Sequence, residues 1–144
     1  MQLFFVILVI KFFIANITFL VIVCLFGCNK AEKDEQAPFI KINLPENHDN
    51  FIRGNLLTYD LEFSDDLQLK SYKINIHSAS IPILKQTNYI WDTTINSSIS
   101  GINYIIKKSF SIPLNVDTGN YLFIVTCSDK AGNEDWVARD FTIH

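Results

Sequence analysis

The chain has 144 residues, enough for one domain, and 49% of them are hydrophobic. The first 27 residues contain 22 apolar side chains and a single charge, Lys11, whereas the remainder carries 11 basic and 15 acidic residues, a net charge of −4. This length is too short for a barrel enzyme, the acidic balance argues against a nucleic-acid partner, and the apolar and aromatic content excludes disorder.

Residues 1–27 are predicted to be a lipoprotein signal peptide. Lys11 precedes a long apolar run, which ends in Leu25-Phe26-Gly27-Cys28. This tetrapeptide resembles the lipobox of bacterial lipoproteins, in which a peptidase cleaves before the cysteine and the cysteine thiol carries a diacylglyceryl group. The resemblance implies lipidation of Cys28, which would attach the mature chain to a membrane.

An uncleaved helix over residues 3–26 is the alternative, because 24 mostly apolar residues are long enough to span a bilayer. Lys11 near the middle of such a helix would cost about 2.5–3.5 kcal/mol on insertion scales. A spanning helix also gives no reason for a cysteine directly after glycine at the end of the run.

Residues 28–37 are predicted to be a flexible lipidated tether, since they are polar, lack apolar periodicity and end before Pro38. Asn29 stands where an inner-membrane retention signal would have Asp. Lys33-Asp34-Glu35 resembles the acidic signal that sends Bacteroidota lipoproteins to the outer face of the outer membrane. We therefore expect an outer-membrane location, with exposure at the cell surface.

From residue 38 onward, apolar and polar residues alternate in short segments bounded by turn residues. No segment keeps helical spacing over three turns, so the pattern predicts an all-β, immunoglobulin-like antiparallel sandwich of about seven strands over residues 38–144. The run at 121–126 is nearly all apolar, which is typical of a central strand buried on both faces. The clearest strands are expected at residues 39–42, 57–63, 72–76, 109–114, 121–126 and 137–143.

Two turns sharpen the fold prediction. Residues 117–121, with Asp117, Gly119 and Tyr121, resemble the tyrosine corner of immunoglobulin-like domains, in which the phenol bonds back to the turn. Residues 128–134 resemble the F–G hairpin of bacterial immunoglobulin-like modules, with Asp129 as the cap of the turn.

With the lipobox and the Ser64-Asp65-Asp66 turn, these segments resemble the uncharacterised immunoglobulin-like lipoprotein family of Bacteroidota, a domain of unknown function. The resemblance covers nearly all of residues 38–144. The resemblance implies a fold and a location in the cell envelope, and it implies no activity.

The sequence contains no catalytic signature, so we expect no enzyme. Nucleophile-elbow, zinc-protease and phosphate-loop motifs are missing, and the histidines are scattered at His48, His77 and His144. Cys127 is the one cysteine left after lipidation of Cys28 and loss of the leader. It lies in an apolar run and is expected to be a small buried residue.

A weak calcium site is the one cofactor hypothesis. The B–C and F–G loops of an immunoglobulin-like sandwich emerge at the same end, which would bring together Asp65, Asp66, Asp129, Asn133 and Asp135. Carboxylate and amide oxygens are the ligands that Ca²⁺ prefers. Turns favour Asp and Asn for conformational reasons as well, so solvated turn residues are the alternative.

Tyr89 and Trp91 are the candidate ligand-binding residues. They lie among Thr and Asn in a long segment between strands, and an exposed Trp beside amides would offer a stacking platform for a sugar. The alternative places Ile90 and Trp91 in a further strand, with one of them in the core. Thr93, in Asp92-Thr93-Thr94, resembles an O-glycosylation acceptor of these bacteria.

The sequence thus favours a lipid-anchored, non-enzymatic binding or accessory module of the bacterial outer membrane. The alternatives are a glycan-binding accessory lipoprotein that uses Tyr89 and Trp91, and a structural subunit of an envelope complex. The first requires an exposed Trp91, and the second requires an uncovered apolar edge or face. The expected partners are a membrane through Cys28, and an envelope protein or a glycan.

Overall fold

The computed structural model describes residue 11, residues 33–79 and residues 91–144. Asp34–His144 form one compact unit. Apart from Lys11, the proposed leader lies outside the described residues, as do Cys28 and Tyr89. In the described part of the chain, no helix is long and apolar enough to cross a membrane.

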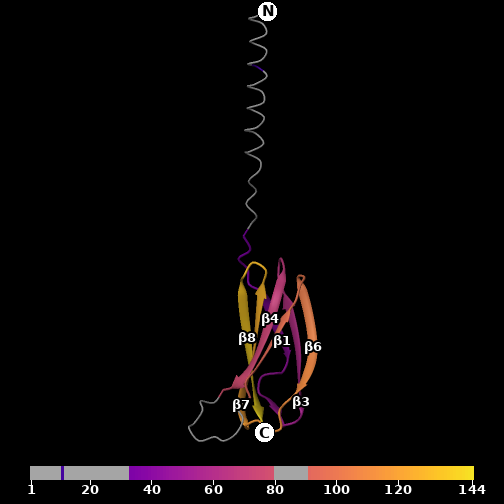
Figure 1. Cartoon of the computed structure of the whole chain (residues 1–144), viewed down its shortest axis with the longest axis vertical. Coiled ribbons are helices and arrows are strands. Elements are labelled where there is room, and N and C mark those ends of the chain that lie inside the picture. The colour runs from indigo at the N-terminus through magenta and orange to yellow at the C-terminus, as the bar shows by residue number, and fades with distance from the viewer. Residues whose placement is uncertain (1–10, 12–32, 80–90) are drawn as a thin grey trace, which may run out of the picture. The chain divides into compact units, whose positions relative to one another are not determined.

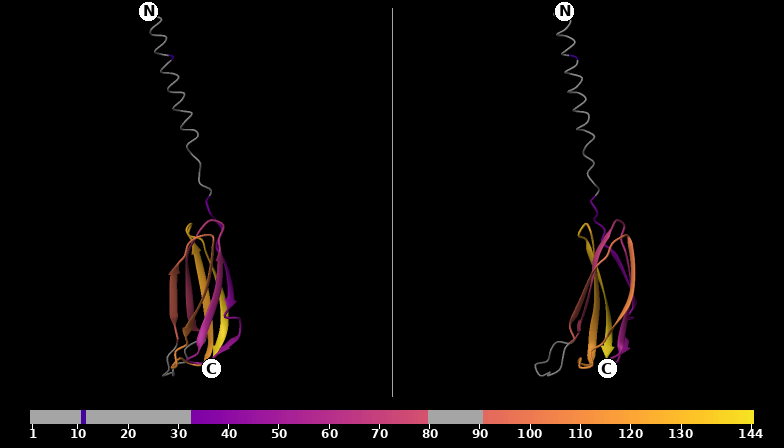
Figure 2. Two further views of the ribbon diagram at one scale, coloured as in Figure 1. Left: turned by 90° about the vertical axis from the view of Figure 1, so that its right-hand side faces the viewer. Right: turned by 45° about the vertical axis from the view of Figure 1, so that its right-hand side comes forward.

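The domain is an all-β immunoglobulin-like sandwich, as predicted (Figures 1 and 2). One sheet has the order β1-β3-β6 and the other has the order β2-β8-β7-β4-β5. All pairings are antiparallel except that of β2 with β8. The strands are β1 (Phe39–Leu44), β2 (Asp49–Phe51), β3 (Leu56–Ser64), β4 (Leu69–Ser78), β5 (Thr93–Ser98), β6 (Asn103–Ser111), β7 (Gly119–Asp129) and β8 (Glu134–Ile143).

Strict alternation in the sequence produces the best-predicted strands. In β3, every second residue from Leu57 to Phe63 is buried, and the residues between them are half-buried. In β4, Tyr72, Ile74 and Ile76 are buried in the same way. Because side chains on a strand point alternately to its two faces, these residues all reach the space between the sheets.

Three strands differ from the prediction. The strand expected at 109–114 is β6, which begins at Asn103 and ends before Pro113; the run Lys107-Lys108-Ser109 hides its alternation. β5 begins at Thr93, after Trp91, and Ile95 is its one apolar residue. β2 has only three residues and lies outside the strands expected from the sequence.

β7 is the central strand of its sheet. The sequence predicts burial of both its faces, and this prediction is wrong. Tyr121, Phe123, Val125 and Cys127 point into the core, whereas Leu122, Ile124 and Thr126 are only half-buried on the outer face. The apolar run therefore reflects one buried face and one partly exposed face.

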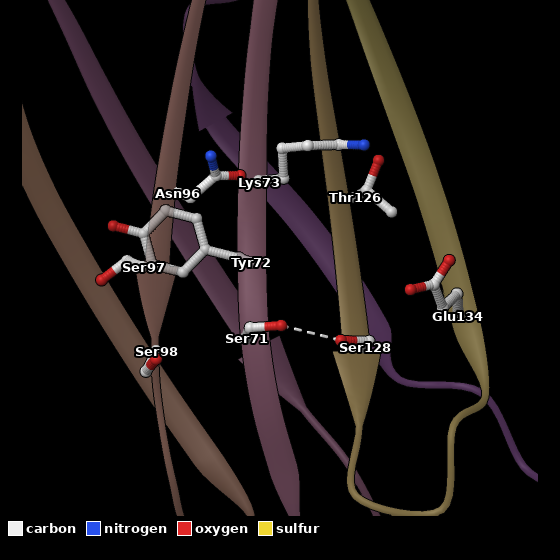
Figure 3. Close-up of a pocket in the computed structure, with 9 residues that line it drawn as sticks. All are labelled: Ser71, Tyr72, Lys73, Asn96, Ser97, Ser98, Thr126, Ser128 and Glu134. Carbon is white, nitrogen blue, oxygen red and sulfur yellow. Dashed lines mark hydrogen bonds between the residues drawn. The ribbon is translucent and has the colours of Figure 1, made fainter.

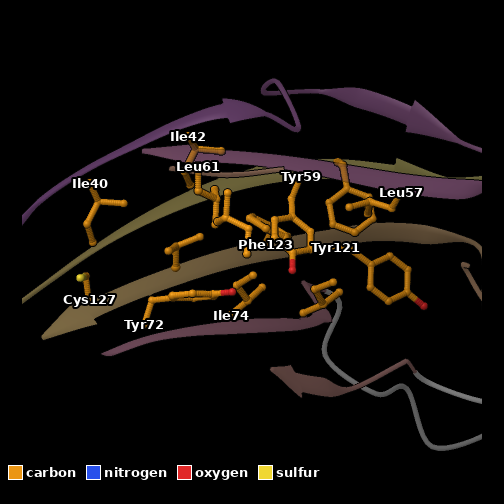
Figure 4. Close-up of a cluster of buried hydrophobic side chains, with 14 of the residues drawn as sticks. Ile40, Ile42, Leu57, Tyr59, Leu61, Tyr72, Ile74, Tyr121, Phe123 and Cys127 are labelled. Carbon is orange, nitrogen blue, oxygen red and sulfur yellow. The ribbon is translucent and has the colours of Figure 1, made fainter. Parts of the chain in front are cut away.

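The core fills the space between the two sheets. Figure 4 shows side chains of β1 and β3 meeting those of β4 and β7. The ring of Phe63 stacks on that of Tyr72 with a centroid distance of 5.2 Å and an interplanar angle of 19°. The ring of Tyr121 stacks on that of Phe141 at 5.7 Å. The Phe63–Tyr72 contact joins the two sheets, whereas the Tyr121–Phe141 contact joins neighbouring strands of the five-stranded sheet.

The tyrosine corner predicted from the sequence is confirmed. The Tyr121 hydroxyl donates a hydrogen bond to the backbone carbonyl oxygen of Asp117, at 2.9 Å, and the Tyr121 residue is 1% exposed. Burial raises the pKa of Tyr121, so the phenol remains a proton donor. The bond fixes the loop between β6 and β7 against the start of β7.

Tyr121→Phe should lower the free energy of unfolding by about 0.5–1.5 kcal/mol, the net value of one hydrogen bond. The substitution keeps the ring that packs on Phe141, so the loss reports the hydroxyl alone. Urea unfolding would measure it as a lower midpoint with an unchanged slope. An unchanged midpoint would contradict a stabilising role for the corner.

Candidate functional site

Two regions of the domain gather polar side chains: one end of the sandwich, and the outer face of the five-stranded sheet. At the end, the β3–β4 loop, the β5–β6 loop and the β7–β8 turn are joined by backbone hydrogen bonds. The Asp65 amide donates to the Ile102 carbonyl at 2.9 Å, and the Lys130 amide donates to the Gln68 carbonyl at 2.9 Å. The expected meeting of the loops that follow β3 and β7 is thus present.

Asp129 closes the β7–β8 turn. Its Oδ1 accepts hydrogen bonds from the backbone amides of Gly132 and Asn133, at 2.6 and 2.8 Å. Its Oδ2 accepts one from the Asn133 side-chain amide at 2.7 Å. Burial by itself raises the pKa of Asp129, but hydrogen bonds from Asn133, Gly132 and Ala131 outweigh burial and hold the pKa below its usual range. Both oxygens of Asp129 are therefore engaged in the turn.

Asn133 connects this turn to the start of the domain. Its side-chain amide donates to the carbonyl oxygens of Asp34 and Gln36, at 3.3 and 3.1 Å. Pro38, directly after this segment, is buried. The domain therefore begins at Asp34, within the stretch predicted to be a flexible tether.

The structure groups the predicted calcium residues differently. Asp65 and Asp66 come together with Asp34, and one carboxylate oxygen from each lies within 4.8 Å of the others. Asp129 and Asn133 serve the turn, and Asp135 is exposed, with its Oδ1 accepting the Trp136 amide at 2.8 Å. Asp34 is not among the residues predicted for the calcium site, because it lies in a polar stretch without periodicity.

The carboxylates of Asp34, Asp65 and Asp66 differ in the hydrogen bonds that their oxygens accept. Asp34 Oδ1 accepts the Gln36 amide at 3.1 Å. Asp65 Oδ2 accepts the Leu67 and Gln68 amides at 3.2 and 2.6 Å. Asp65 Oδ1 is buried and has no hydrogen-bond partner within the described part of the chain. The group concentrates negative charge, and a cation beside it would reduce the repulsion.

Trp91 is in the core, so it does not supply the exposed ring that the predicted sugar platform requires. It is 4% exposed and lies edge-on to Phe110, with a centroid distance of 5.6 Å and an angle of 68°. Its ring also lies 6.3 Å from that of Tyr121. The core alternative therefore describes Trp91 correctly, although the residue precedes β5 instead of lying within a strand.

A hollow of about 310 Å³ lies on the outer face of the five-stranded sheet (Figure 3). Two of its lining residues, Ser71 and Ser128, have hydroxyl oxygens 2.8 Å apart. Sequence analysis missed the hollow because its polar residues are the solvent-facing positions of separate strands, which single-strand patterns assign to a solvated face. It is lined by Ser71, Tyr72, Lys73, Asn96, Ser97, Ser98, Thr126, Ser128 and Glu134.

Cys127 is inaccessible, and His48 is paired. Cys127 is fully buried, and burial raises the pKa of its thiol to about 12. A thiol with that pKa stays protonated at neutral pH and is a poor nucleophile. His48 forms an exposed pair with Asp140, which joins the loop before β2 to β8.

Asp129→Asn should destabilise the domain by about 1–3 kcal/mol at pH 7, because it replaces a charged acceptor of three hydrogen bonds in a buried turn. Since the folded-state pKa of Asp129 is lowered, its contribution is present above the ordinary Asp pKa of about 3.9 and is lost as pH falls through the folded value. Urea unfolding at pH 7 and pH 3 should therefore give a smaller difference between the variant and the native chain at pH 3. Asp135→Asn, at an exposed position in the same hairpin, is the control and should change little.

Asp66→Asn should raise the melting temperature by about 1–3 °C at low salt, because it removes one of three neighbouring negative charges. The gain should vanish near 1 M sodium chloride, where the Debye length is about 3 Å. Melting the native chain in calcium and in sodium at equal ionic strength separates general screening from a specific ion site. Micromolar affinity would add about 4 kcal/mol at millimolar calcium, and a calcium-specific rise of that size would contradict the view of the cluster as mere repulsion.

Comparison with solved structures gives distant similarity. The sporulation control protein Spo0M of Bacillus subtilis is 6% identical with a TM-score of 0.49, over 75% of this chain and 49% of that one. Catalytically inactive OgpA of Akkermansia muciniphila, in complex with an O-glycopeptide, is 6% identical with a TM-score of 0.51, over 81% and 32%. The CARDB domain of PF1109 from Pyrococcus furiosus, in complex with di-metal ions, is 10% identical with a TM-score of 0.46, over 81% and 100%.

This chain thus spans about half of Spo0M and a third of OgpA, and identities this low concern the fold alone. No curated protein matches the chain. The family described as Domain of unknown function (DUF4625) matches residues 26–144, more than four fifths of the sequence, and the chain belongs to that family.

Proposed function

We propose that the chain is a lipid-anchored, non-enzymatic immunoglobulin-like binding or accessory module of the bacterial outer membrane. The observation that carries the proposal is the attachment of Asp34 and Gln36 to the β7–β8 turn through Asn133. Cys28, the proposed lipid site, lies six residues before Asp34 in the sequence.

The short spacer supports an oriented module. Six extended residues reach at most about 20 Å, so lipid on Cys28 would hold the end that carries Asp34 close to the membrane. The same end carries the β7–β8 turn, whereas the C-terminus lies at the opposite end of the domain (Figure 1). The sheet faces and the far end would then be free to meet a partner in the envelope.

A binding role is supported by what the reactive side chains do. Asp129 holds a turn, the Cys127 thiol is buried and protonated, and His48 is paired with Asp140 on the surface. These groups stabilise the domain, and none of them combines a nucleophile with a base. The polar hollow on the five-stranded sheet is instead suited to holding a ligand.

Outer-membrane placement is supported by the sequence around the proposed lipid site. Asn29 follows Cys28, and an acidic pair follows Lys33. Asp34 belongs both to that acidic pair and to the folded domain, because its backbone carbonyl accepts the bond from Asn133. The recognition of this signal and the docking of the domain would therefore share a residue.

Cys28→Ala should give a chain that carries no lipid and keeps residues 1–27, because the thiol that accepts the lipid is gone. The intact mass of the protein extracted from membranes measures both effects, because the retained apolar leader would itself keep the variant in a detergent phase. Cys24→Ala is the matched control, since it removes a thiol four residues earlier in the apolar run and should leave both unchanged. Membrane partition of Cys28→Ala with normal processing would refute the anchor.

A further inference from the structure

The outer face of the five-stranded sheet carries two rows of polar side chains that cross four strands. Strand pairing aligns Ser98, Ser71, Ser128 and Glu134 in one row. It aligns Asn96, Lys73, Thr126 and Trp136 in the next. Three inter-strand spacings make each row about 14 Å long. All of these residues except Trp136 line the hollow.

Trp136 is the exception in this polar surface. It is 65% exposed, although Trp is one of the residues that proteins most often keep largely covered. Glu134, two residues earlier on β8, lines the hollow, so strand alternation places Trp136 on the same face. Thr126, its direct cross-strand partner, also lines the hollow. The indole therefore stands next to the hollow, one strand beyond Thr126.

The lining defines the chemistry of a ligand. Ser, Thr and Asn side chains offer hydroxyl and amide groups that both donate and accept hydrogen bonds. The charged side chains are Lys73 and Glu134, one of each sign, and neither forms an ion pair within the described residues. Figure 3 shows the Lys73 amine extending across toward Thr126. A ligand here would be uncharged and rich in hydroxyl groups.

The exposed indole completes this description. The face of an aromatic ring is electronegative and packs against the weakly positive C–H groups on one side of a sugar ring. The opposite sheet offers a contrast, because its outer face pairs its charges: Lys41 with Glu62 at 3.0 Å and Lys107 with Asp60 at 3.2 Å. Pairing of that kind occupies the groups that a neutral ligand would need.

We propose that the outer face of β5, β4, β7 and β8 binds a neutral oligosaccharide, with Trp136 as the stacking platform and the two rows as its hydrogen-bonding partners. The inference rests on the proposed binding role and names its ligand class and its site. The site is separate from Trp91, which is in the core.

The test uses the purified full chain with its lipid, in detergent, and neutral hexasaccharides of glucose, mannose, xylose and galactose as probes. Because Trp91 is buried, acrylamide should quench mainly the emission of Trp136. Binding of a hexasaccharide should protect that emission in the native chain, and titration calorimetry should give an affinity for the same sugar.

Trp136→Ala should weaken this binding at least about tenfold, in line with the loss of a central aromatic contact. Asn96→Ala should weaken it several-fold. Phe39→Ala is the matched control, because Phe39 is 62% exposed on β1 in the other sheet, and its removal should leave the affinity unchanged. The urea midpoint of each variant checks that the fold is retained.

Two results would overturn the inference: no binding of any of the four sugars by the native chain, or equal affinity in Trp136→Ala and the native chain. Protection of Trp136 in the native chain needs no substitution, so a variant that fails to fold does not remove the test. Membrane partition is measured on the same preparation. Partition without sugar binding refutes this site and leaves the anchor intact, and sugar binding without partition does the reverse.

Discussion

The carboxylate of Asp129 is the constraint on which one end of this domain depends. Its two oxygens accept three hydrogen bonds from the β7–β8 turn, in a position with no exposed surface. The turn sets the alignment of β8 on β7, which runs without a register shift from Ser128 and Glu134 to Gly119 and Ile143. That alignment places Trp136 beside Thr126. The same turn orients the Asn133 amide that holds the start of the domain.

A second constraint acts at the opposite end of β7. The Tyr121 hydroxyl ties the preceding loop to the strand, while its ring packs between Trp91 and Phe141. The central strand is therefore fixed near one end by the three hydrogen bonds of Asp129, near the other by the hydrogen bond of Tyr121, and along its length by one buried face. The outer face of the sheet lies away from the core, which is why polar residues and an exposed indole can occupy it.

Local patterns predict much of this fold and little of its surface. Leu57 to Phe63 and Tyr72 to Ile76 were predictable because their alternation matches one buried face, and Tyr121 because its corner is a local motif. The pattern fails at β5, whose side chains are polar apart from Ile95, because an edge strand is held mainly by backbone pairing with β4. The hollow and the group around Asp34 join residues distant in sequence, and only the register of the strands and the packing of the loops bring them together.

The reaction of the Cys127 thiol with a reagent can report when the central strand, β7, separates from its neighbours. The thiol lies at 0% exposure and is protonated while the domain is closed, so a thiol reagent meets it only when β7 separates from its neighbours. Under fast reclosing, the labelling rate is proportional to the population of the open form. The labelling rate of this one native side chain therefore gives the free energy of opening of the sheet that carries the proposed binding face.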